Sequence, residues 1–132
     1  MDLEKFAQFR VAGCREALDD GKSWSFYLLN DNCAALDEVL LYEVGYEWGN
    51  WGNTESVNVS ITGLGPGKHA LIWRDDGSGA ELRMDLWLRV KLRGKTVALH
   101  FEFPKLYRLK NLQLVDDLGK PGWVETARIS LG

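Results

Sequence analysis

Apolar and polar residues alternate along most of the chain that follows Gly21. This period of two is typical of β-strands that bury one face and expose the other. Glycine and asparagine residues separate the alternating segments, as tight turns between strands require. The segments that the pattern predicts as strands are 24–29, 40–47, 56–61, 69–74, 82–92, 95–103, 112–115 and 123–131.

The longest alternating stretch, residues 82–103, predicts a hairpin in which Arg93 and Gly94 form a two-residue turn. In that register Trp87 lies opposite His100 on the outer face. Every inward-facing pair is then apolar, so the turn and the hydrophobic pattern specify the same register. The inward pairs are Val90 with Val97, Leu88 with Leu99, Leu86 with Phe101 and Met84 with Phe103.

The segment 1–20 has a different period and predicts a short helix from Leu3 to Leu18. Its apolar residues recur at three- and four-residue spacing, with charged residues between them. An extended conformation at 9–11 is the alternative, because two apolar residues there lie off the stripe. The residues of the stripe are Leu3, Phe6, Cys14, Ala17 and Leu18.

Several short strands with one apolar face each predict an antiparallel, two-sheet β-sandwich of about eight strands, with a β-barrel as the alternative. A chain of 132 residues suits one domain, which we divide into the helix at 1–20 and the sandwich at 22–132. In the last predicted strand, Glu125 interrupts the inward face. We therefore expect a bulge or an edge position there.

Composition and charge narrow the class of protein and its partners. The chain is 45% hydrophobic and 27% charged, which is ordinary for a globular domain. No apolar run approaches the ~20 residues needed to cross a bilayer, and the N-terminus does not resemble a signal peptide. Basic residues are scattered, and the net charge is −3. We therefore expect a cytoplasmic protein with no membrane insertion and no nucleic-acid partner.

No metal or cofactor site is predicted. Cys14 and Cys33 lack the spacing of a metal or redox motif. The glycine-rich segment 63–67 precedes a strand, whereas a phosphate-binding loop needs a helix at that point. Residues 61–69 resemble a turn of the copper–zinc superoxide dismutases, but the two histidines of this chain are too few for the histidine-rich metal site of that family.

Catalysis is not favoured by the residues present. No serine lies in a Gly-x-Ser-x-Gly motif. Most carboxylates occupy turns, where aspartate is favoured by local backbone geometry alone. The catalytic alternative is a small hydrolase that uses carboxylates, or that has His69 or His100 as its base.

The chain has six tryptophans, and two of them lie in one predicted loop. Connections between antiparallel strands alternate between the ends of the fold, so the loops 48–53, 75–79 and 104–108 share one end. This end combines aromatic and charged side chains, which suits binding of a protein partner or a small polar ligand. In the alternative, Trp48 and Trp51 fold back and cap the core. The candidate binding residues are Trp48, Asn50, Trp51, Asp75, Asp76, Tyr107 and Arg108.

The outer face of the predicted long hairpin offers a second candidate surface, formed by Trp87, Arg89 and His100. The register also places Asp85 opposite Glu102. Like charges across a strand pair repel, so we expect an arginine to bridge these two carboxylates. We expect the N-terminal helix to cover this face.

Taken together, the residues favour a non-catalytic β-sandwich module that recognises a protein partner or a small polar ligand through aromatic and acidic loops. The small hydrolase is one alternative. A structural subunit that assembles through an edge strand or through the Trp87 face is another.

Overall fold

The computed structural model describes residues 9–15, 23–48, 51–75, 83–104, 112–126 and 128–130, with the side chains of all of these except 48, 51 and 128–130. Ten strands lie within this part of the chain. They are β1 (Phe9–Arg15), β2 (Trp24–Asn30), β3 (Leu36–Trp48), β4 (Trp51–Leu64), β5 (His69–Asp75), β6 (Arg83–Leu92), β7 (Lys95–Phe103), β8 (Gln113–Val115), β9 (Lys120–Thr126) and β10 (Arg128–Ser130).

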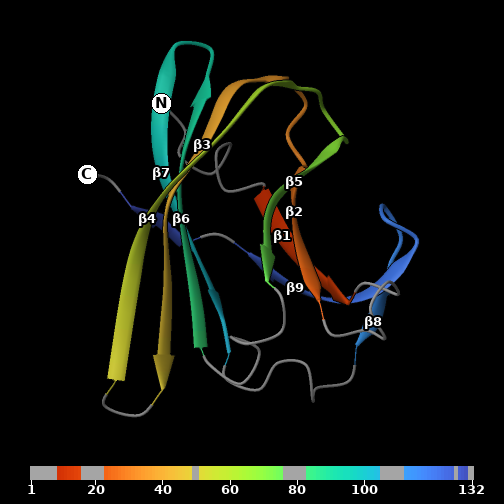
Figure 1. Ribbon diagram of the computed structural model, residues 1–132. Helices are drawn as coiled ribbons and strands as arrows, with labels where there is room; N and C mark the ends of the chain where they lie inside the picture. The colour runs from red at the N-terminus through yellow and green to blue at the C-terminus, as the bar shows by residue number, and fades with distance from the viewer. Residues whose placement is uncertain are drawn as a thin grey trace.

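The strands form two antiparallel sheets that pack face to face (Figure 1). Sheet I has the strand order β5-β2-β1-β9-β8, and sheet II has the order β10-β7-β6-β3-β4. Consecutive strands change sheet after β2, β4, β5, β7 and β9. The predicted β-sandwich is therefore confirmed.

Apolar side chains from the facing sides of the two sheets fill the interior. Phe26 of sheet I meets Phe103 of sheet II edge to face, with ring centroids 5.1 Å apart. Gly13 makes room for this pair, because a Cβ at its position would lie 2.7 Å from Cε1 of Phe26. The largest buried side chains of this main core include Trp24, Phe9, Phe26, Phe101 and Phe103.

β6 and β7 form the predicted hairpin in the predicted register. Trp87 pairs with His100, and the four inward pairs are those that the apolar pattern specifies. Arg93 and Gly94 have positive φ angles of 51° and 78°, which is the backbone conformation that a tight two-residue hairpin turn favours.

The predicted N-terminal helix is wrong where the structure describes it, because residues 9–15 form β1. This strand lies at the centre of sheet I, between β2 and β9. One of its faces is buried in the main core and the other in a second apolar cluster. A strand buried on both faces loses the alternation of a half-buried strand, so its apolar residues resembled a helix. The extended alternative at 9–11 is confirmed, while 1–8 and 16–20 lie outside the described residues.

The predicted strand 123–131 forms two strands in the structure. β9 ends at Thr126 in sheet I, whereas β10 begins at Arg128 and joins sheet II. The predicted bulge at Glu125 is wrong, because β9 pairs with β1 in regular register through that residue. The alternative of an edge position agrees with the structure, since β8 pairs with β9 only at residues 120–122.

β3 departs from simple alternation. Its register with β6 shifts between Leu41 and Glu43, which leaves Tyr42 as an extra residue. Leu41 and Val44 both belong to the main core. Tyr42 lies on the outer face, where the guanidinium of Arg89 is 4.7 Å from its ring centroid. The shift decides which residues of β3 reach the outer face of sheet II.

The described strand ends lie at the two ends of the sandwich in the order that antiparallel alternation predicts. At one end the side-chain amide of Asn30 donates to the backbone carbonyls of Leu64 and Gly65, at 3.1 and 3.2 Å. The β2–β3 and β4–β5 connections therefore lie together. The tip of the β3–β4 hairpin and the last residues of β5 and β7 point toward the opposite end, in the lower half of Figure 1.

Candidate functional site

Most of the predicted loop-end site lies outside the described side chains. Trp48 and Trp51 form the last register pair of the β3–β4 hairpin, and only their backbone is described. Asp75 lies on β5 opposite Trp24 and is 5% exposed, so it is a buried residue of the sheet. The loop-end site therefore stays a prediction. The candidates outside the described segments are Asn50, Asp76, Tyr107 and Arg108.

The described tryptophans differ in whether they pack against the main core or lie on the outer face of a sheet. Trp73 packs against the main core and donates its indole N–H to the hydroxyl of Tyr46 at 3.0 Å. Trp123 also packs there and donates to a carboxylate of its own strand at 2.7 Å. Trp87 differs, because the hairpin register places it on the outer face of sheet II.

Trp87 and His100 form the pair that the hairpin register predicts, and their rings are stacked. The centroids are 4.9 Å apart and the planes differ by 1°. Nε2 of His100 lies 2.6 Å from Oδ1 of Asp85, a carboxylate whose side chain is 5% exposed. The imidazole is thus held between an indole face and a buried carboxylate, which restricts the orientation of both rings.

Arg83 bridges the carboxylates around this pair, and the expected bridging arginine is confirmed. Its guanidinium lies 3.3 Å from Asp85, 3.2 Å from Glu102 and 3.6 Å from Glu47. Partial burial acts to lower the pKa of Arg83, but the three carboxylates outweigh burial and raise that pKa above its ordinary value. Three carboxylates and one guanidinium leave two formal negative charges on this group.

Gly45 lies next to Trp87 on the neighbouring strand β3, in register with Thr54 and Asp85. A Cβ at this position would lie 3.0 Å from Cζ3 of Trp87 and 3.3 Å from Cγ2 of Thr54. The missing side chain therefore lets the indole ring lie close to the sheet. An isolated glycine in an alternating strand is a signal of such close approach, and it is the signal that could have found this site.

A hollow of about 240 Å³ opens beside this indole on the outer face of sheet II. We call it the Trp87 hollow. Of the residues that line it, Trp87 is the one that the sequence singled out as a site residue. The others come from β3, β4 and the start of β6, and the β3 register shift brings them together. The lining includes Gly45, Glu47, Asn53, Thr54, Arg83 and Trp87.

Arg89, the third residue of the predicted hairpin surface, lies farther along β6 and is not among the residues that line the hollow. Its guanidinium is placed over Tyr42 instead. The expectation that an N-terminal helix covers this face is wrong for residues 9–15, which belong to sheet I.

A second hollow, of about 420 Å³, lies along the β8–β9 hairpin of sheet I. Leu114 and Val124 line it and are exposed, together with the partly buried Arg10. Arg10 lies 2.6 Å from Asp31 and 3.6 Å from Asp117. The hydrogen bond to Asp31 outweighs partial burial and raises the pKa of Arg10. The cation of this hollow is therefore already engaged by carboxylates.

Within the described ranges, no group of three histidine, cysteine, aspartate or glutamate side chains is placed to hold a metal ion. The same part of the chain contains no helix long and apolar enough to cross a membrane. No protein-family model matches the sequence, and comparison with curated proteins found no match. The Trp87 hollow is therefore the feature of the described structure that bears most directly on function.

Proposed function

We propose that the protein is a non-catalytic binding module, and that the Trp87 hollow receives a lysine or arginine side chain of a protein partner. The observation that carries the proposal is the hollow, which combines an indole wall, a glycine at Gly45 and carboxylates nearby. Its volume of about 240 Å³ is below the ~300–1,000 Å³ of sites that enclose whole small molecules. That size suits a single side chain.

The charge around the hollow favours a cation. The two excess negative charges come from a group in which Asp85 is engaged by both Arg83 and His100. Glu47 is different, because its side chain is 47% exposed and lies 3.6 Å from Arg83. It is the carboxylate that an incoming cation reaches. An exposed ion pair of this kind contributes about 1 kcal/mol or less, so a partner must add further contacts.

Trp87 supplies the aromatic part of recognition. A cation over an indole face gains about 0.5–1 kcal/mol at an exposed site. The stack with His100 and the close approach to Gly45 hold the indole in place before a ligand arrives. A ring that is already ordered loses little side-chain entropy on binding, which favours affinity.

The hollow adjoins the loop end that the sequence predicts as a binding site. Glu47 pairs with Gly52, and the next pair along the hairpin is Trp48 with Trp51. A peptide chain seated in the hollow would therefore extend toward the β3–β4 tip. This adjacency supports a single binding surface that includes both predicted regions.

An NMR titration of the full chain tests the proposal. Blocked lysine, arginine and glutamate derivatives are added separately, and the shift of the Trp87 indole N–H is followed. We expect saturable shifts with the two cations and none with glutamate. The Glu47→Gln variant should respond more weakly to the two cations, because it lacks the exposed carboxylate of the hollow. Glu38→Gln is its matched control, because Glu38 lies on the same face of β3 but beside Lys91. Equal responses to lysine and glutamate would overturn the proposal.

One observation favours a second function. The 2.6 Å contact between Asp85 and Nε2 of His100 pairs a histidine with a carboxylate, as in hydrolases, although the carboxylate of a Ser-His-Asp triad contacts Nδ1 instead. The described side-chain contacts of His100 are this carboxylate and the Trp87 ring. The nucleophile of a hydrolase would therefore have to be another residue or a water molecule. Ester hydrolysis by the wild type that His100→Gln abolishes would support the hydrolase; an inactive wild type would argue against it.

A further inference from the structure

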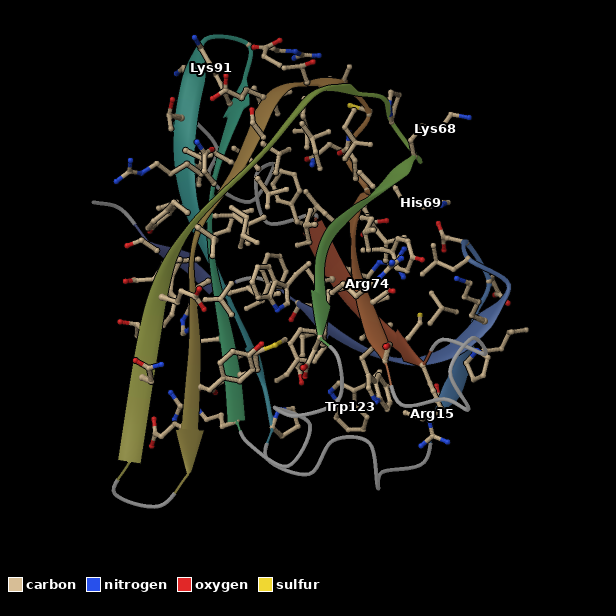
Figure 2. The ribbon with its side chains drawn as sticks, in the orientation of Figure 1. Arg15, Lys68, His69, Arg74, Lys91 and Trp123 are labelled. Atoms are coloured by element: carbon tan, nitrogen blue, oxygen red, sulfur yellow. The ribbon has the colours of Figure 1, made fainter. Side chains whose placement is uncertain are left out.

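The two sheets have four edge strands among the described strands, and these differ in how they are protected from pairing with another chain. β8 and β10 are three residues long. β5 is seven residues long and carries His69 and Arg74, whose side chains Figure 2 labels. β4 is fourteen residues long. Between Gly52 and Thr62, Glu55 is its one charged residue, and lysine and proline are absent.

β4 is open to solvent along most of its length. Residues 52–56 are exposed, and so are Asn58, Ser60 and Thr62 on the outward-facing side. On the side away from β3, no described strand pairs with β4. The alternate residues are half-buried against the main core, so an apolar row continues to the margin of the sheet. These residues are Val57, Val59 and Ile61.

A long edge strand with one charge is a template for pairing, because its outer row of backbone N–H and C=O groups can continue the ladder. Natural proteins usually shorten or charge such edges, and the other three edges of this sandwich follow that rule. β4 is the exception. The length of this edge and its single charge indicate that a strand of another chain pairs with it.

We propose that a second copy of this chain pairs with β4, strand to strand and antiparallel, so that sheet II continues across a two-fold axis. An antiparallel pair of identical strands is symmetric, and two-fold symmetry is the commonest symmetry of homodimers. The inference is independent of the cation proposal, because the paired segment is centred beyond the β4 residues that line the Trp87 hollow.

Two registers fit the strand. The first is centred on Asn58 and pairs Val57 with Val59; the second is centred on Val59 and pairs Val57 with Ile61. The second register places apolar residues opposite apolar residues on one face and polar residues opposite polar residues on the other, and the first does the same except that Glu55 lies opposite Ile61. Glu55 faces an uncharged residue in either register, so no like charges meet. A strongly charged foreign strand would find no complementary charges along 56–62.

Sedimentation velocity across a concentration series tests the pairing. We expect the wild type to shift from monomer to dimer as its concentration rises, and Asn58→Lys to remain monomeric because it places lysines at the centre of the pair. Gln113→Lys is the control, since it makes the same kind of change on the short edge strand β8. Circular dichroism verifies that each variant is folded. A wild type that is monomeric throughout the micromolar to millimolar range would overturn the proposal.

Disulfide trapping tests the position of the axis. In a Cys33→Ser background, which removes the exposed native thiol, Asn58→Cys or Val59→Cys should give a covalent dimer under mild oxidation. The residue at the two-fold centre faces its own copy, so one of the two variants should be trapped efficiently. A dimer that forms in solution but is trapped by neither variant, and that Asn58→Lys leaves intact, would place the interface elsewhere and contradict the proposal.

Discussion

The outer faces of the two sheets differ in what covers them. On sheet I, Ala12, Cys14, Leu29 and Val115 form a buried apolar cluster beside the β8–β9 hairpin. On sheet II, the outer face carries stacked rings, ion pairs and the Trp87 hollow, and no described strand packs over it. Sheet I therefore buries apolar side chains on its outer face, whereas sheet II carries ion-paired polar groups there, and the proposed partner would bind to these groups.

A glycine on each outer face makes the comparison testable. Gly122 on sheet I and Gly45 on sheet II each admit a neighbouring group at short distance. At Gly122 the nearest group is backbone, which cannot move without disturbing the sheet. At Gly45 it is the far end of an aromatic side chain, which has to shift by only a few tenths of an ångström. The same substitution should therefore have different consequences at the two positions.

Gly122→Ala should have the largest effect on stability. The new Cβ would lie 2.7 Å from the carbonyl oxygen of Gly13 and 2.8 Å from Sγ of Cys14. Overpacking of this kind costs about 1–3 kcal/mol of unfolding free energy. Urea denaturation measures the loss. A variant as stable as the wild type would show that Gly122 does not pack as closely against Gly13 and Cys14 as described.

Asp85→Ala should be intermediate. The variant removes the buried acceptor that His100 and Arg83 share, and hydrogen bonds to charged groups contribute about 1.5–3 kcal/mol where they are well shielded. Because Arg83 is partly exposed, we expect a loss of about 1–2 kcal/mol by urea denaturation. Glu102→Gln is the control and should cost about 0.5 kcal/mol or less. Equal losses would contradict the central position of Asp85.

Gly45→Ala should change stability by less than about 1 kcal/mol, because the Trp87 ring can yield to a contact of 3.0 Å. Its effect on the hollow should be larger, since the new methyl group displaces the ring and fills the space beside it. We expect altered Trp87 fluorescence and at least a several-fold loss of lysine binding. Unchanged lysine binding would show that the space beside Trp87 is not part of the binding site.

The sequence predicts the β6–β7 hairpin and its bridging arginine because several local signals agree. The turn at Arg93 and Gly94 and the apolar pairs specify one register, and the opposed carboxylates of Asp85 and Glu102 then require a cation between them. These features can be predicted without any knowledge of contacts between segments that are distant in sequence. The cytoplasmic location and the absence of a nucleic-acid partner stay predictions of composition.

Other features depend on tertiary structure and were missed for that reason. β1 resembled a helix because a second apolar cluster, formed with residues distant in sequence, buries its outer face. The Trp87 hollow depends on the extra residue Tyr42 in β3, which sets the register of Gly45 against β6. The change of sheet between β9 and β10 was missed as well, because the interruption of the apolar pattern at Glu125 does not by itself distinguish a change of sheet from a bulge or an edge position.

The most direct test of the binding proposal compares lysine affinity in two charge variants of the hollow. Glu47→Gln removes one negative charge and should weaken binding of a lysine peptide several-fold, whereas Arg83→Gln removes the positive charge and should strengthen it. Both effects should shrink as salt is raised. Opposite changes in the dissociation constant, measured by NMR titration, are the predicted result. Changes of the same sign, or none, would contradict a cation-binding role for the Trp87 hollow.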